Sequence, residues 1–522
     1  MRRVVAIVMA AGALAVGGGA YAWSELIPGP PVTIAIVPAE DIALAPTTQL
    51  QFAADVRDAR NRVVGTQPTW ASEAPIDDRG LFTAPSRAAV YYVQAAIGEL
   101  VATAKITVKP GAARTARVLP ATASLKPRDF VAFSTAAADE WGNNVPVTPT
   151  WRVTAGGGAI DAQGIFTAGA SGGSTITADV EGITASATVT AECVPPRTEA
   201  AAGLTFTIVC GATADVWLNG NGLDAPSVTT TIDEAVVAVE AALGRSLRHR
   251  LNVNVFATKA SFDIGLKQLL RVEPTPLEAG VYIWPATVAI DWSAHDVPEA
   301  IARHEITHLI LDEASGRRAS VPFWLHEGLA TLNEFPLSAD TELISRYCTA
   351  SAAKASQIPA LPSIATGPGW RAYVNDVGVI AYYLAAQVAS FVVSDAGGES
   401  KLLDRMGGGV PIEVAYGAAS GRSFDTFTSD LNDRALALAD AYPGIATTTR
   451  ASDGGMAYVV YGQPPDARVS VNISNARFGG SSSPTTNRYG CSMGLLGNNW
   501  PRGTYLVTLN GPAGRATANL VR

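Results

Sequence analysis

The first 190 residues contain an internal repeat, and its length limits what this part of the chain can fold into. Residues 68–70 (PTW) recur at 149–151, and residues 80–84 (GLFTA) recur as GIFTA at 164–168. The two tryptophans are 81 residues apart and the two phenylalanines 84. Units of this length are whole domains, not the short units of a solenoid, so we expect two similar domains in succession.

Short runs of alternating apolar residues fill each unit, for example at 101–108 and 185–189, and Gly, Pro and Asn separate these runs. This pattern is typical of an antiparallel β-sandwich. Over residues 32–109 and 114–191 the units resemble bacterial Ig-like domains of extracellular proteins, which carry a W…G-x-F-T-A signature. The resemblance implies two all-β Ig-like sandwiches. Neither copy has a cluster of titratable residues, so we interpret both as spacers or adhesive modules with a possible cell-surface or extracellular ligand.

Residues 1–22 have the pattern of a secretory signal peptide. Arg2 and Arg3 precede an apolar stretch, and residues 20–22 (AYA) form a small-x-small cleavage site. An uncleaved membrane anchor is the alternative, although the glycines at 17–19 dilute the apolar stretch. In both cases we expect the protein to be secreted or held at the cell surface.

The net charge argues against one class of partner. The chain has 46 acidic and 38 basic residues, a formal charge of −8, and no long basic run. Binding to nucleic acid requires Lys and Arg to neutralise the phosphates. We therefore expect no nucleic-acid partner.

An exported chain with an even number of cysteines is expected to contain disulfides. Cys193 and Cys210 flank one short segment and are the natural pair. Cys348 and Cys491 would then tie the central region to the C-terminal tail. Free buried thiols are the alternative.

The pattern changes after Cys210. Residues 232–243 have helical spacing and end at Gly244, residues 251–256 alternate as a strand, and a helix-rich stretch continues to about residue 441. A polar linker and a tail of alternating strands follow. These patterns predict one mixed domain over residues 215–445 and a small all-β domain over residues 453–522.

The sequence HEITH, which begins at His304, places three side chains suited to metal chemistry on a predicted helix. Asp296 and Pro298 indicate that this helix begins just upstream. His304 and His308 are one turn apart on the same face, so both can reach one Zn²⁺. Glu305 lies beside them, where it could take a proton from a zinc-activated water.

A third protein ligand would complete an open catalytic zinc site, and the next predicted helix supplies one. Ser320 and Pro322 indicate the start of that helix. Glu327 follows His308 by 19 residues, and a loop through Gly316 would let the second helix fold back on the first. We therefore expect the Glu327 carboxylate to point at the same metal.

This HExxH sequence, followed by residues 324–330 (WLHEGLA), resembles the gluzincin metallopeptidases, whose third ligand lies in a W-L-x-E-G-x-A phrase. The resemblance covers about residues 215–440. It implies an α+β thermolysin-like metallopeptidase core, a sheet subdomain followed by a helical one, between the Ig-like sandwiches and the C-terminal β domain. A buried polar cluster is the alternative, which is disfavoured because the chain has only five histidines.

Gluzincins add a group that donates a hydrogen bond to the oxyanion. Tyr373, Tyr382 and Tyr383 are candidates, and aligning residues 398–402 (GESKL) with peptidase-MA-like sequences selects Tyr383. A tyrosine packed in the core is the alternative. We expect His326 not to bind the metal but to line the cleft or to be a satisfied surface residue.

The sequence thus predicts a secreted or cell-surface zinc metallopeptidase, an endopeptidase that acts on peptides or proteins. It lacks the G-x-M-E-N element of gluzincin aminopeptidases, which disfavours that activity. Thr331 stands where thermolysin-like enzymes have Asp, so the partner that orients the histidines is left open. The alternatives are an Ig-like surface adhesin with an inactive metallopeptidase-like domain, and hydrolysis of a non-peptide amide.

Overall fold

The computed structural model describes residues 27–40, 42–169, 171–276, 278–294, 297–316, 321–450, 455–496 and 499–522. The chain divides into two units, of which the first comprises residues 1–123, 131–166 and 173–189 and the second residues 124–130, 167–172 and 190–522. The predicted signal peptide and the capping residues Asp296 and Ser320 lie outside the described residues. In the part that is described, no helix is long and apolar enough to cross a membrane.

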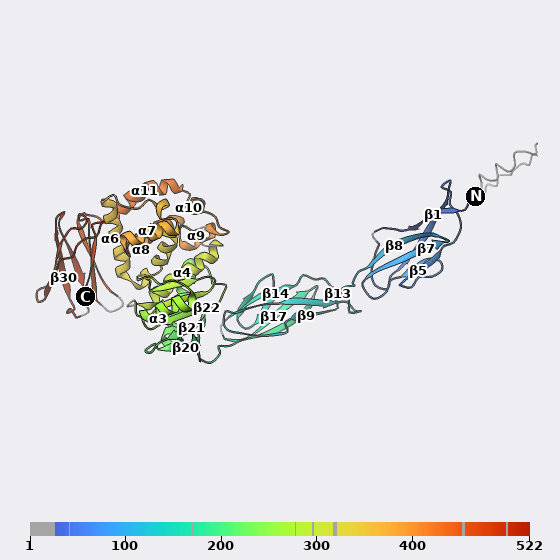
Figure 1. Cartoon of the computed structure of the whole chain (residues 1–522), viewed down its shortest axis with the longest axis horizontal. Helices are drawn as coiled ribbons and strands as arrows, with labels where there is room; N and C mark the ends of the chain where they lie inside the picture. The colour runs from blue at the N-terminus through green and yellow to red at the C-terminus, as the bar shows by residue number, and fades with distance from the viewer. Residues whose placement is uncertain are drawn as a thin grey trace, which may run out of the picture. The chain divides into compact units, whose positions relative to one another are not determined.

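The two repeat copies consist of strands (Figure 1), and each copy forms three small sheets. The sheets of the first copy have the orders β1-β4, β2-β8-β7-β5 and β3-β6, and those of the second β10-β18-β17-β14, β11-β16-β15 and β13-β12-β9. The strands of the first copy are β1 (Pro31–Val37), β2 (Ile42–Leu44), β3 (Gln49–Gln51), β4 (Ala53–Asp58), β5 (Thr69–Ser72), β6 (Leu81–Thr83), β7 (Val90–Ile97) and β8 (Leu100–Val108). Those of the second are β9 (Thr115–Leu119), β10 (Thr122–Leu125), β11 (Phe130–Ala132), β12 (Ser134–Ala138), β13 (Asn144–Val145), β14 (Thr150–Ala155), β15 (Gly158–Ile160), β16 (Ile165–Ala168), β17 (Gly172–Val180) and β18 (Ile183–Ala191).

The repeated W…G-x-F motif has a steric cause. Gly80 has φ = +84°, and a Cβ there would lie 2.7 Å from the backbone oxygen of Phe52 and 2.8 Å from the Trp70 ring. Gly164 has φ = +83° and meets the equivalent atoms of Phe133 and Trp151 at 2.5 and 3.0 Å. Only glycine combines this backbone conformation with so close an approach of the tryptophan.

The central sheet has the strand order β19-β20-β21-β22-β24-β23. Strands β21, β22 and β24 are parallel, and the other pairs are antiparallel. The 19-residue helix α2 connects β21 to β22 and buries Ile232, Val236 and Val239 in the main core. The strands are β19 (Arg197–Ala201), β20 (Leu204–Cys210), β21 (Ala214–Asn219), β22 (Leu251–Phe256), β23 (Gly280–Ile283) and β24 (Thr287–Asp291).

Most helices follow this sheet in the chain and share its core. The α-helices are α2 (Ala225–Leu243), α3 (Lys259–Ile264), α4 (Pro298–Ser315), α5 (Phe323–Leu332), α6 (Ala339–Lys354), α7 (Gly367–Val377), α8 (Ile380–Ala396), α9 (Glu399–Met406), α10 (Ile412–Ser420) and α11 (Phe424–Leu436). Shorter π or 3-10 segments are η1 (Gly265–Leu270), η3 (Phe335–Leu337) and η4 (Leu361–Ile364).

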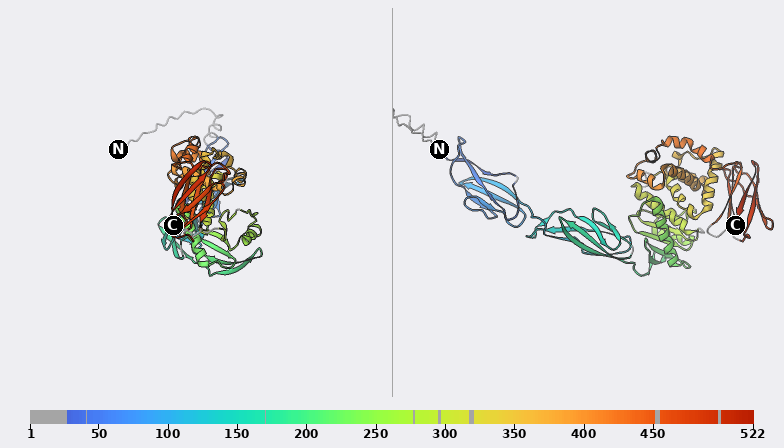
Figure 2. Two further views of the ribbon diagram at one scale, coloured as in Figure 1. Left: turned by 90° about the vertical axis from the view of Figure 1, so that its left-hand side faces the viewer. Right: turned by 180° about the vertical axis from the view of Figure 1, so that it is seen from behind.

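The C-terminal strands form two sheets, ordered β25-β26-β29 and β28-β27-β30-β31. They lie beside α6 (Figure 2), and Val459 and Tyr461 share a buried cluster with Ile344 of that helix. Both predicted disulfides are present, Cys193–Cys210 and Cys348–Cys491. The strands are β25 (Gly444–Thr449), β26 (Met456–Tyr461), β27 (Ser470–Ser474), β28 (Gly479–Ser482), β29 (Ser492–Leu496), β30 (Thr504–Gly511) and β31 (Gly514–Val521).

The fold class expected from the sequence, with an α+β thermolysin-like core at its centre, is wrong. The described residues contain more strand than helix, in nine sheets of two to six strands beside ten α-helices, and they show no clear protease core of that kind. Two features explain the difference. The central sheet takes β19 and β20 from residues before the expected domain boundary at 215, and α6 and α8 are buried together with C-terminal strands beyond the expected boundary at 445.

Candidate metal centre

Helices α4 and α5 carry the candidate ligands. Pro298 occupies the first turn of α4, where its missing N–H costs nothing, and Gly316 ends the helix in the left-handed conformation. Pro322 is the residue directly before α5, at the N-cap position, where proline is tolerated. Both helices are buried along most of their length. Polar side chains on them must therefore find partners or a ligand.

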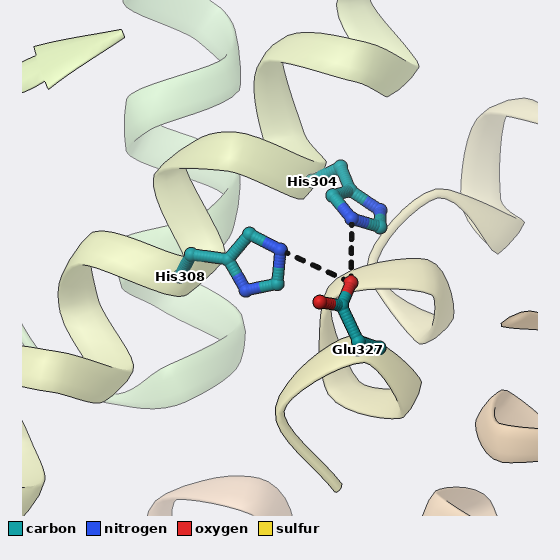
Figure 3. A group of neighbouring side chains, drawn as sticks. All are labelled: His304, His308 and Glu327. Carbon is teal, nitrogen blue, oxygen red and sulfur yellow. Dashed lines mark ion pairs between the residues drawn. The ribbon is translucent and has the colours of Figure 1, made fainter. Parts of the chain in front are cut away.

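The structure brings together the three side chains that the sequence selects as ligands (Figure 3). The His304 and His308 rings project from α4 toward the Glu327 carboxylate on α5. Nε2 of His304 is 3.5 Å and Nε2 of His308 is 3.4 Å from Oε2 of Glu327. One ligand atom from each residue lies within 4.8 Å of the others, the only such group among the described residues.

The two nitrogen–oxygen separations fit zinc. Zinc–ligand bonds of about 2.0–2.2 Å in tetrahedral geometry put neighbouring donor atoms roughly 3.4 Å apart. The donor set of two imidazoles and one carboxylate is also one that zinc uses in catalytic sites. The residues present therefore fit a zinc ion bound by three protein side chains.

The electrostatics of the metal-free cluster are strongly coupled. Burial lowers the pKa of His308 to about 3, so its ring is neutral at pH 7, as a metal ligand must be. Burial also opposes a charge on His304, but hydrogen bonds with Glu327 and Glu334 raise its pKa well above the ordinary value. Burial alone would raise the pKa of Glu327, yet His308 and His304 hold it well below its usual range. The two carboxylates beside His304 thus favour the protonated form of its ring.

Glu334 contacts a candidate ligand and was not among the residues that we selected from the sequence. His304 Nδ1 donates a hydrogen bond of 2.6 Å to Glu334 Oε1, and Nε2 on the other side of the ring faces Glu327. A carboxylate on the far nitrogen of a ligating histidine fixes the tautomer and the ring orientation. Glu334 follows Glu327 by seven residues, or two helical turns, and that spacing was the available signal.

Glu305 is buried beside the ligands, 6% exposed. Its carboxylate packs against the backbone of β23, because a Cβ on Gly280 would lie 2.6 Å from Glu305 Oε1. Burial raises the pKa of Glu305 to about 8, an effect that His304 opposes and Glu327 and Glu334 reinforce. At this pKa the carboxyl is mostly protonated at pH 7, and a cation held by the three candidate ligands would lower the pKa and allow Glu305 to accept a proton.

Among the candidate tyrosines, Tyr382 is the one that the structure places near the ligands. Its ring centroid is 6.3 Å from that of His304 and 5.4 Å from that of Trp370. Burial and the nearby charges of Glu327 and Glu305 raise the pKa of Tyr382, so its hydroxyl stays a donor.

The other two candidate tyrosines have different surroundings. The structure places Tyr383 against the separate buried cluster that includes Ile344 and Cys348, and its backbone oxygen accepts a hydrogen bond from Ser345. The Tyr373 hydroxyl accepts a hydrogen bond of 3.0 Å from Tyr489. Neither contact joins these side chains to the three candidate ligands.

His326 lies neither on the surface nor among the ligand atoms. It is 1% exposed, its ring stacks on that of His308, and its Nε2 is 3.1 Å from Asp312 Oδ1. We expected a cleft or surface position for this residue, and the structure places it in the interior.

No family model matches the chain, and no curated protein matches it. Several solved structures resemble part of it. The S-layer protein rSbsC is 15% identical over 36% of this chain and 31% of that one, with a TM-score of 0.19. Yersinia pseudotuberculosis InvD is 20% identical over 32% and 60%, with a TM-score of 0.23. The N-terminal four Ig domains of Dscam1 isoform 6.44 are 12% identical over 32% and 47%, with a TM-score of 0.21.

Proposed function

We propose that the chain is a zinc-dependent hydrolase that cleaves peptide bonds, a metallopeptidase of the gluzincin ligand type. One observation carries the proposal. Three candidate ligand side chains from two packed helices bring their donor atoms within 4.8 Å of one another, with both nitrogen–oxygen separations at zinc spacing, and the buried carboxylate of Glu305 lies beside them.

The number of ligands favours catalysis over a structural role. Structural zinc sites in proteins have four protein ligands, whereas catalytic sites have three and keep one position for water or substrate. The metal-ligating group in the described part of the chain has three members, His304, His308 and Glu327. This count supports an open site.

Zinc held in this way supplies Lewis-acid polarisation of a carbonyl and lowers the pKa of water toward about 7. The residues around it have separate tasks. His304, His308 and Glu327 hold the ion, and Glu334 orients the His304 ring. Glu305 accepts a proton from water as the carbonyl is attacked and returns it to the leaving amine.

Tyr382 completes this set as a hydrogen-bond donor to the oxyanion. Its hydroxyl stays protonated at neutral pH, and its ring lies near those of His304 and Trp370. In this proposal Tyr382, which approaches the ligands, takes the role that the alignment gave to Tyr383. Trp370 holds the Tyr382 ring by an edge-to-face contact with an interplanar angle of 88°.

Two disulfides support a site of action outside the reducing cytosol. Cys348–Cys491 joins α6 to the C-terminal strands across 143 residues, and a crosslink over so long a loop strongly restricts the unfolded chain. A secreted or cell-surface peptidase benefits from such links. Its substrates would be peptides or proteins.

Cleavage of a peptide library by the purified chain tests the proposal. Wild type and Glu305→Gln are compared at equal zinc content, with and without a chelator. Glu313→Gln serves as the matched control, since Glu313 lies on the same helix but accepts a hydrogen bond from the backbone of Arg248 instead. We expect chelator-sensitive cleavage that Glu305→Gln lowers by at least about 10²-fold and the control leaves intact.

Two outcomes would contradict the proposal. Equal cleavage by wild type and Glu305→Gln would place the activity elsewhere. A wild-type protein that cleaves nothing but binds a protein partner tightly would favour a surface adhesin.

A further inference from the structure

The two candidate histidine ligands are supported in different ways. Histidines that bind metals almost always donate a hydrogen bond from the second ring nitrogen. His304 does so, to Glu334. His308 Nδ1 is buried and has no hydrogen-bond partner among the described residues. The second ring nitrogen of His308 therefore does not fix the ring through a hydrogen bond to the described chain.

Ring packing supplies that support. The His326 ring stacks on the His308 ring with the centroids 4.5 Å apart and the planes only 11° apart. The Tyr282 ring lies 4.7 Å from His308 and 5.9 Å from His326, so the three rings form one cluster. Such near-parallel contact restricts rotation of the His308 ring about its side-chain bonds.

His326 is itself held in place. Its Nε2 donates to Oδ1 of Asp312 at 3.1 Å, and their side chains are 2% and 6% exposed. Asp312 lies one turn after His308 on α4, and His326 directly precedes Glu327 on α5. The hydrogen bond therefore joins the two helices next to a ligand on each. Separating the two side chains would leave the Asp312 carboxylate buried without its partner, which costs free energy, so the pair stays together.

We propose that His326 and Asp312 are positioning residues for the metal site. Asp312 fixes the plane of the His326 ring, and the His326 ring face holds His308 with Nε2 at 3.4 Å from Glu327 Oε2. This inference rests on the proposed zinc site. It assigns to His326 the support of the second histidine, which Glu334 provides for the first.

The test measures the zinc dissociation constant and the visible spectrum of the cobalt-substituted protein, together with the melting temperature of the metal-free form. In His326→Gln an amide N–H can still reach Asp312 but the ring is gone. We expect a zinc dissociation constant about 10–100-fold higher and a changed cobalt spectrum. A residue that only fills the core would lower the melting temperature and leave both metal readouts unchanged.

Two double variants keep the inference testable if His326→Gln does not fold. Asp312→Leu/His326→Phe retains a ring and Asp312→Leu/His326→Leu does not, and both replace the buried polar pair with apolar residues that a core tolerates. The zinc dissociation constant of the variant with Phe should be lower than that of the variant with Leu by about tenfold or more. Thr331→Val is the matched control on α5, because its buried hydroxyl has no hydrogen-bond partner in the described chain.

The outcomes separate the two proposals. Unchanged zinc affinity and cobalt spectrum in His326→Gln, or equal affinities for the two double variants, would overturn the positioning role while leaving the proposed function intact. A wild-type chain that binds no zinc would overturn both.

Discussion

Replacing Gly280 with alanine is expected to disable Glu305 and to leave the zinc ligands in place. Gly280 is the first residue of β23, the strand at the edge of the central sheet. A Cβ at this position would lie 2.6 Å from Oε1 and 2.8 Å from Cγ of Glu305, and 2.7 Å from Cγ2 of Ile301. None of these three nearest atoms belongs to a proposed zinc ligand.

The size of the effect follows from these distances. Carbon atoms in contact prefer a separation of about 3.5–4.0 Å, so the new methyl group overlaps its neighbours by about 1 Å. Ile301 is fixed in the core, so the Glu305 carboxylate has to move. A displacement of about 1 Å can reduce a rate about 10²-fold, which corresponds to about 2.7 kcal/mol of transition-state stabilisation. The crowding should also reduce the free energy of unfolding by about 1–3 kcal/mol.

The assay measures kcat/KM for peptide cleavage, the zinc content and the melting temperature of Gly280→Ala. Gly417→Ala is the control, because Gly417 lies within α10 and the nearest atom to its added Cβ is at 3.6 Å. The control should keep full activity and be slightly more stable. Wild-type kcat/KM in Gly280→Ala would refute the claim that the position of Glu305 matters. Loss of zinc would show that the change does not stop at Glu305.

Three further predictions concern the same site. Glu327 and Glu334 raise the pKa of His304 and so favour a proton on its ring, which zinc has to displace. Calorimetry at pH 7 should therefore show release of at least about one proton on zinc binding, and the affinity for zinc should increase with pH. An affinity for zinc that does not depend on pH would contradict this. Tyr382→Phe should lower kcat by up to about 10²-fold at normal zinc content, whereas the kcat of Tyr383→Phe should stay near the wild-type value. The reverse result would favour Tyr383, the choice based on the alignment. Glu334→Ala should raise the zinc dissociation constant about 10–100-fold in a chelator competition, and an unchanged constant would remove its orienting role.

The candidate ligands could be selected from the sequence because helical geometry alone determines which of these side chains share a face. A spacing of four residues puts His304 and His308 on one face whatever surrounds the helix. Glu334 was harder to find, since α5 ends at Leu332 and the seven-residue spacing from Glu327 crosses the helix end. Neighbouring residues on a helix point about 100° apart, so an alignment shifted by one position exchanges Tyr382 for Tyr383.

The extent of the central fold could not be predicted in the same way. Strand β19 is exposed along most of its length and shows no alternation of apolar residues, so residues 197–201 carried no strand signal. The cluster that buries Ile344 with Val459 and Tyr461 depends on contacts between distant segments, and local periodicity does not encode such contacts. The disulfides were easier, because four cysteines allow few pairings.

Zinc binding by the purified chain is the most direct test of the metal centre. The measurement is metal content by mass spectrometry after dialysis, together with the dissociation constant from chelator competition, for wild type, His304→Ala/His308→Ala and Glu327→Ala. We expect close to one zinc per wild-type chain, no tight binding in the double variant and markedly weaker binding in Glu327→Ala. A double variant that retains one tightly bound zinc, or a wild-type chain that binds none, would contradict this expectation.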